Sequence, residues 1–103
     1  MQCNPHSRLD VELSFDGVVA TVIVAGELDI ATATVLSERL LEVGAGHPER
    51  IVLDLSKLVF IDVAGARALD KTHKLLKAEC PVILRSPRPS ARKVFRLTGL
   101  MAG

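Results

Sequence analysis

Carboxylates at three points of the sequence could do chemistry. Asp54 lies inside the apolar run Ile51–Leu55, and Glu27 and Asp29 follow an earlier apolar run. An aspartate at a strand with two further carboxylates beside it can hold Mg²⁺ and accept a phosphate. Such a site also requires a lysine at the end of a later strand, where this chain has Arg85. Phosphate acceptance at Asp54 is therefore kept only as a minor alternative.

Asp62 lies directly before a stretch with helical periodicity that begins near Val63. A carboxylate at that position accepts hydrogen bonds from the free N–H groups of the first turn and faces the positive end of the helix dipole. Asp62 is thus either an ordinary helix cap or a residue with a function of its own. The sequence leaves both interpretations open.

We find no constellation of residues for catalysis or for a metal. His6, His47 and His73 are far apart and have no acidic or thiol partner at motif spacing, so we expect His73 to be structural. Cys3 and Cys80 are too few for a disulfide framework and fit a reducing compartment. A redox switch between these two cysteines is an alternative to two unrelated thiols. The sequence predicts a protein that is not an enzyme and has no cofactor.

The composition is that of one globular domain. Of 103 residues, 49% are hydrophobic and 24% are charged, and the formal net charge is +1. No apolar run approaches the roughly 18 residues that a membrane-spanning helix needs. The first seven residues also lack the apolar segment of a signal peptide. We expect a cytoplasmic protein without membrane insertion.

The charges are divided unevenly along the chain. Residues 1–70 contain 5 basic and 11 acidic side chains, whereas residues 71–103 contain 8 basic and 1 acidic. The basic residues form two arrays at helical spacing: Lys71, Lys74 and Lys77, then Arg88, Arg92, Lys93 and Arg96. Solvated helix faces explain both arrays, and a surface for an acidic partner is the alternative. Because Trp and Tyr are absent, we expect no direct binding of nucleic acid.

Hydrophobic periodicity predicts the first three elements. Apolar and polar residues alternate over 9–16, which predicts a strand, and Asp16-Gly17 is typical of a hairpin turn. The nearly unbroken β-branched run over 18–25 predicts a central strand covered on both faces. A helical pattern follows over 32–43.

The second half continues the alternation of strands and helices. Strands are predicted over 51–55 and 81–85, and a short apolar segment over 58–61 leads into the helix that begins near Val63. Ser90 is the predicted cap of a last helix. The order β-β-α-β-α-β-α predicts an α/β fold with a mixed sheet, in which an N-terminal hairpin is followed by β-α units and about three helices cover the sheet.

The helix that begins near Val63 is predicted to be amphipathic. We expect Leu69, Leu75 and Leu76 on its buried face and Arg67 on its exposed face.

Motifs in four places resemble those of the STAS domain family, in the same order and at matching spacing. They are Gly26-Glu27-Leu28-Asp29, the strand Ile51–Leu55, the segment Phe60–Gly65 and Leu97-Thr98-Gly99-Leu100. The resemblance implies a single STAS domain over residues 9–103 after a flexible tail over residues 1–8. Relatives usually continue after the last motif with another strand and helix, which we expect to be missing here.

The best-known soluble members of this family are bacterial anti-sigma factor antagonists. The resemblance implies that such a domain docks on an anti-sigma factor, usually a GHKL-type kinase-like protein, and releases the sigma factor it held, which regulates transcription. In the family, a serine at the start of the second helix is phosphorylated, and the added charge disrupts docking. Val63 occupies this phospho-acceptor position and Ala64 the next, so neither can accept a phosphate.

The resemblance places the partner-binding residues around the start of the second helix. They are Asp62, Val63, Ala64, Gly65, Ala66 and Arg67, with Asp29 from the neighbouring strand end. We expect Val63 and Ala64 to form an apolar centre and Asp62 and Arg67 its charged rim.

Three alternatives differ in kind from this function. Some short STAS proteins that resemble this one in having Ala before the Gly bind the ATPase of a lipid ABC transporter as accessory subunits. A phospho-acceptor at Asp54 would make the domain similar to response-regulator receivers, and the basic Arg88–Arg96 array would serve a nucleic-acid binder. The sequence predicts no oligomeric state.

Overall fold

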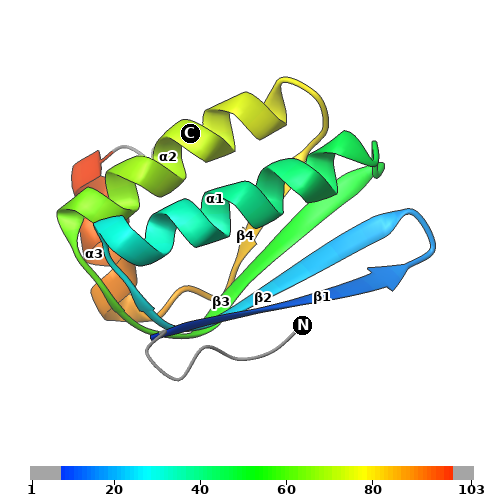
Figure 1. Ribbon diagram of the computed structural model, residues 1–103. Helices are drawn as coiled ribbons and strands as arrows, with labels where there is room; N and C mark the ends of the chain where they lie inside the picture. The colour runs from blue at the N-terminus through cyan, green and yellow to red at the C-terminus, as the bar shows by residue number, and fades with distance from the viewer. Residues whose placement is uncertain (1–7, 99–103) are drawn as a thin grey trace.

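The structure, a computed structural model, describes residues 8–98. Most of the expected tail, Cys3 and the expected end of the domain lie outside these residues. The element order is β-β-α-β-α-β-α, as predicted (Figure 1). The elements are β1 (Leu9–Asp16), β2 (Val19–Leu28), α1 (Ile30–Ala45), β3 (Arg50–Ile61), α2 (Val63–Lys77), β4 (Val82–Arg85) and α3 (Pro89–Thr98).

The four strands form one mixed sheet in the order β1-β2-β3-β4. β1 and β2 are an antiparallel hairpin whose last pair is Asp16 with Val19. Gly17 in the two-residue turn has a φ of 64°, a conformation that glycine adopts at little cost. β3 runs parallel to both β2 and β4. The predicted α/β architecture is therefore confirmed.

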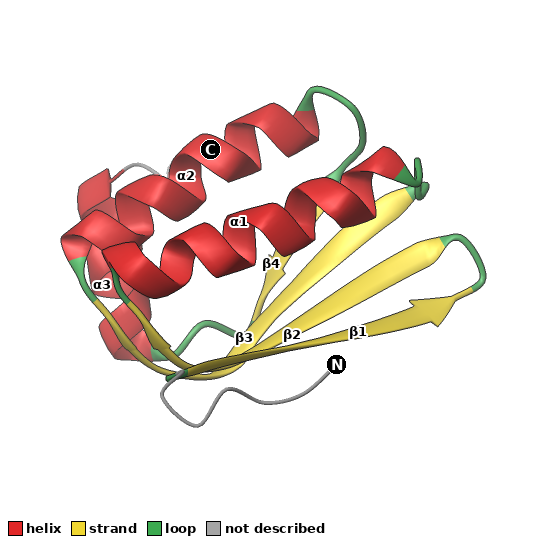
Figure 2. Cartoon of the chain, in the orientation of Figure 1, coloured by secondary structure: helices red, strands yellow, loops and turns green. Residues whose placement is uncertain are grey.

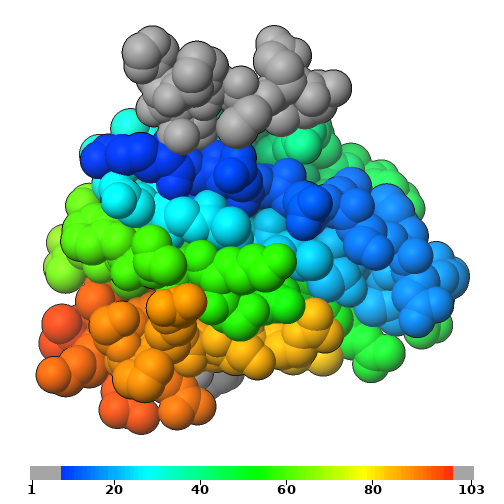
Figure 3. Space-filling model, turned by 90° about the horizontal axis from the view of Figure 1, so that it is seen from below, coloured from blue at the N-terminus to red at the C-terminus, as the bar shows by residue number. Residues whose placement is uncertain are grey.

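α1 and α2 lie side by side on one face of the sheet (Figure 2), and α3 packs against α2 and β3. The opposite face shows the strands without a covering helix in the part of the chain that is described (Figure 3). The prediction that the β-branched run is covered on both faces is wrong. Ala20, Val22 and Val24 are buried beneath the helices, but Thr21 and Ile23 are only half-buried on the open face. Neighbouring strands on both sides, rather than a second layer, shield these two side chains.

The core fills the space between the helices and the sheet. Leu36 and Leu40 from α1, Leu69 and Leu76 from α2, and Phe95 from α3 are almost completely buried. Leu75, which was predicted to be buried, is exposed. Consecutive helical residues point about 100° apart, so Leu75 and Leu76 cannot both face the sheet.

Several boundaries differ from the prediction. Residues 58–61 are the end of β3 rather than a separate segment, because the strand continues through register shifts in its pairing with β2. α1 begins at Ile30, directly after its capping residue. Ser90 is the second residue of α3 instead of its cap, because Pro89 takes the first helical position, where no N–H is needed.

His73 on α2 is buried, as its structural assignment predicts. Burial lowers the pKa of His73 below its usual value of 6.5, and the positive charge of Lys77 acts in the same direction. A backbone hydrogen bond with Val82 and the charge of Asp70 oppose this shift, and Lys74 adds to it. The imidazole is therefore neutral in the folded protein at neutral pH.

The free energy of unfolding is expected to fall as the pH drops below 6.5, the usual pKa of a histidine side chain. The unfolded state, in which His73 has its ordinary pKa, binds the proton more readily than the folded state. The lowered pKa values of Asp29 and Asp54 have a similar effect only at lower pH, around and below 3.8. Urea unfolding between about pH 7.5 and pH 5.5 measures this decrease in the free energy of unfolding. The free energy of unfolding of a His73→Gln variant should depend less on pH. An unchanged pH dependence would contradict the role given to His73.

Candidate partner-binding surface

The carboxyl ends of β2 and β3 lie next to each other, and a helix starts directly after each of them (Figure 1). Leu28, the last residue of β2, is paired with Ile61, the last residue of β3. The next residues, Asp29 and Asp62, cap α1 and α2. The N–H of Asp62 donates to the carbonyl of Leu28 at 3.2 Å, which ties the two helix starts together.

Asp62 caps α2 as the sequence predicts. Its Oδ1 accepts a hydrogen bond of 2.7 Å from the N–H of Gly65. Gly65 lies so close to β2 that a Cβ atom there would be 2.6 Å from the carbonyl oxygen of Leu28. A glycine at this position therefore lets α2 begin directly against the strand end.

Asp29 forms a reciprocal cap with Thr32. Its Oδ1 accepts from the N–H of Thr32 at 2.9 Å, and the Thr32 Oγ1 accepts from the N–H of Asp29 at 2.9 Å. Arg8 pairs with Asp29 and, at 3.3 Å, with Glu27. Hydrogen bonds from Thr32 are the main cause that lowers the pKa of Asp29, and the charge of Arg8 contributes. The carboxylate of Asp29 is thus already paired with Thr32 and Arg8 of the same chain.

The first turns of α2 separate the predicted contact residues into two sets. Val63, Ala64 and Arg67 are exposed, whereas Gly65 and Ala66 are buried. The helical period turns Gly65 and Ala66 toward the sheet, and partner contact at the predicted positions stays a prediction. These two residues position the exposed ones.

Two apolar residues at this end of the sheet were not predicted. Ile30, the first residue of α1, is 60% exposed, and Phe60, near the end of β3, is 49% exposed. Val63, the first residue of α2, is 39% exposed. The sequence does contain a signal for Ile30, because an apolar residue follows each of the two capping aspartates directly. We call Ile30, Phe60, Val63 and Ala64, with Asp62 and Arg67 beside them, the docking surface.

Asp54 lies away from the docking surface. Its carboxylate accepts hydrogen bonds of 3.0 Å from the N–H of Ser56 and from Arg85. Asp54 is paired with Ile23, several residues along the strand from Glu27. Residues 8–98 contain no group of acidic, histidine or cysteine side chains that could hold a metal ion. The interpretation of Asp54 as a receiver-like phospho-acceptor is therefore not supported.

Cys80 follows α2 and is buried. Burial raises the pKa of its thiol, which disfavours the reactive thiolate. The pairing of Cys80 with Cys3 stays a prediction, because Cys3 lies outside the described residues.

Replacing Asp62 with alanine is expected to lower the free energy of unfolding by about 1 kcal/mol, the usual effect of losing a helix cap. Asp62→Asn should retain most of the stability, since an amide oxygen also accepts from the N–H of Gly65. Urea unfolding measures both variants, with Glu38→Ala on the exposed side of α1 as the control. Equal stability of Asp62→Ala and the wild type would show that the cap contributes nothing.

None of the helices within residues 8–98 combines the length and the hydropathy needed to cross a membrane.

Comparison with known proteins identifies the family. Residues 10–102 match the STAS domain. The anti-sigma-F factor antagonist RsfB of Mycobacterium tuberculosis is 39% identical over 82 residues, which cover 80% of this chain and 67% of RsfB. A crystal structure of an anti-sigma factor antagonist from Mycobacterium paratuberculosis superimposes with a TM-score of 0.79 at 30% identity, covering 96% of this chain and 84% of the other. The anti-sigma factor antagonist SpoIIAA in its unphosphorylated form has the same fold, with a TM-score of 0.70 at 23% identity over 88% of this chain and 82% of SpoIIAA. This chain belongs to the STAS domain family.

Proposed function

We propose that this protein is an anti-sigma factor antagonist, which binds an anti-sigma factor and thereby releases a sigma factor. The 39% identity to RsfB and the structural similarity to the Mycobacterium paratuberculosis antagonist support this function. The main structural observation in support of this function is the group of exposed apolar side chains beside two capped helix starts. Ile30, Phe60 and Val63 are exposed without serving the core, which is typical of a protein-binding surface.

The docking surface suits binding rather than catalysis. Its centre is apolar, and Asp62 and the exposed Arg67 provide charge at the edge, as at other protein interfaces. We propose that the chain acts in the cytoplasm as a binding protein, with a single STAS domain over residues 9–103. Asp29 contributes mainly by holding α1 and Arg8 in place.

We further propose that docking is not controlled by phosphorylation at the start of α2. Val63 and Ala64 have no hydroxyl group. At the neighbouring helix start, the hydroxyl group of Thr32 donates to the carbonyl of Glu27 and belongs to the cap of α1. A kinase-like anti-sigma factor with ATP should therefore leave the affinity unchanged.

Release of a sigma factor tests the proposed function. Complexes of sigma factor with each anti-sigma factor of the source organism are immobilised, and this protein is added with and without prior incubation with ATP. We expect one complex to release its sigma factor in both conditions. Release from none of them, together with binding to an ABC-transporter ATPase, would favour the accessory-subunit alternative instead. Phosphorylation that prevents release, for example at Ser56, would contradict only the constitutive binding.

The charge of Asp62 is tested in the same assay. Asp62→Asn keeps a capping oxygen but removes the charge at the edge of the docking surface. We expect weaker binding with nearly unchanged stability. Unchanged binding would show that Asp62 acts as a cap only.

A further inference from the structure

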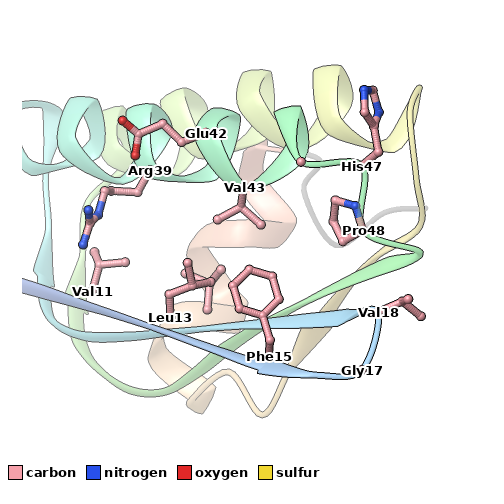
Figure 4. A pocket seen from close by; sticks show the side chains of 12 residues that line it. Val11, Leu13, Phe15, Gly17, Val18, Arg39, Glu42, Val43, His47 and Pro48 are labelled. Carbon is pink, nitrogen blue, oxygen red and sulfur yellow. The ribbon is translucent and has the colours of Figure 1, made fainter.

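A groove lies between β1 and the second half of α1, at the far end of α1 from the docking surface. Its volume is about 390 Å³, within the usual range of small-molecule sites (Figure 4). Its walls are mainly apolar side chains from the hairpin and from α1: Val11, Leu13, Phe15, Val18, Val22 and Val43. None of these residues takes part in the proposed docking.

The groove exists because α1 packs on β2 and only marginally on β1. Leu13 and Phe15 point toward α1 in Figure 4, yet they remain 47% and 60% exposed. Val22 and Val43 are buried and close the groove on the inside. Two large apolar side chains therefore face solvent across a preformed hollow, which is typical of a binding site rather than of a core.

A single cation lies at one end of the groove. Arg39 of α1 reaches down beside Val11, whereas Glu42 turns away from the apolar floor (Figure 4). Arg39 forms no ion pair with any residue between 8 and 98. His47 and Pro48 line the other end. The groove thus combines a mainly apolar channel with one guanidinium that has no ion-pair partner in this part of the chain, and the carboxylate of Glu42 also belongs to its lining.

We propose that this groove binds a linear aliphatic carboxylate, such as a free medium-chain fatty acid. The hydrocarbon chain would lie along Leu13 and Phe15, and the carboxylate would pair with the guanidinium of Arg39. The planar fork of arginine matches a carboxylate in two parallel hydrogen bonds, and the apolar walls remove the chain from water.

A second copy of the chain fits the groove less well. Pairing of two β1 edges would bring Glu12 and Asp16, which point to the open face of the sheet, next to the same residues of the other copy. Like charges across such a pair are destabilising. Charge complementarity therefore favours a small anion over self-association.

The test uses the full chain and decanoate, followed through the backbone amide signals by NMR. We expect saturable shifts at residues 11–18 and 39–48. Arg39→Gln should weaken decanoate binding by roughly tenfold, whereas Arg92→Gln on α3 should not change it. Decanol, which has the same chain without the charge, should bind the wild type and Arg39→Gln equally. Both variants replace side chains outside the core, so their spectra without ligand also verify the fold.

Three kinds of result would overturn the proposal. The first is the absence of saturable shifts at the groove, or decanoate binding that is equal in the wild type and Arg39→Gln. The second is a set of groove shifts that depends on protein concentration without ligand, which would assign the groove to a second copy. The third is a response to phosphatidylglycerol vesicles but not to monomeric decanoate, which would indicate a membrane surface. None of these results bears on the release of a sigma factor.

Discussion

Replacing Val63 with glutamate is expected to lower the affinity for the anti-sigma factor by about 100-fold or more, because an unpaired charge would be buried at the interface. Val63 lies at the start of α2, with Asp62 directly before it. On docking, the new carboxylate would lose its water next to apolar side chains and a second carboxylate. The free protein should still fold, since Val63 is partly exposed and a negative charge is favourable at a helix N-terminus.

Calorimetric titration with the anti-sigma factor measures the effect. Leu75→Glu is the matched control, because Leu75 is an exposed apolar residue of the same helix in its last turn. Val63→Gln separates the charge from the size of the side chain. If Val63→Glu binds the anti-sigma factor like the wild type, the docking surface lies elsewhere on the protein. The same follows if Leu75→Glu binds as weakly as Val63→Glu.

Replacing Gly26 with alanine is expected to lower the free energy of unfolding by about 3 kcal/mol or more, because backbone strain and a steric clash occur together. Gly26 has a φ of 109°, and a Cβ atom there would be 2.0 Å from the carbonyl oxygen of Arg8. The same carbonyl accepts a 2.7 Å hydrogen bond from the N–H of Glu27. Alanine would therefore push the start of β1 away from β2.

Gly17→Ala is the matched control for this prediction. Gly17 also has a positive φ, but no atom lies within 4 Å of where its Cβ would be. Only the conformational cost remains there, about 1 kcal/mol. Thermal or urea unfolding compares the two variants. Equal losses would show that the close approach to Arg8 contributes little.

The elements and the cap of α2 could be predicted because their signals are local. The alternation over β1, the turn at Gly17 and the aspartate before α2 depend on residues close together in the sequence. The partner of Asp29 could not be predicted in the same way. Arg8 is 21 residues away, and only the β1-β2 pairing brings it to the edge of the docking surface.

Exposure was harder to predict than secondary structure. An unbroken β-branched run is compatible with either one or two covering layers. The partial exposure of Thr21 and Ile23 could therefore not be predicted from the residue types. The exposure of Ile30 and Phe60 depends on which elements fail to cover the end of the sheet. The burial of Ala66, by contrast, follows from the helical period once the first residue of α2 is known.

The strand order β1-β2-β3-β4 is the order of the strands in the chain, which has a consequence for how the protein forms during synthesis. Each new strand joins the edge left by the strand made before it, so no strand has to insert between two older ones. Contacts between neighbouring segments favour rapid folding, and a nascent chain can add them one at a time. The docking surface is built from α1, β3 and α2. We therefore expect its parts to be assembled on the ribosome before β4 and α3 have emerged.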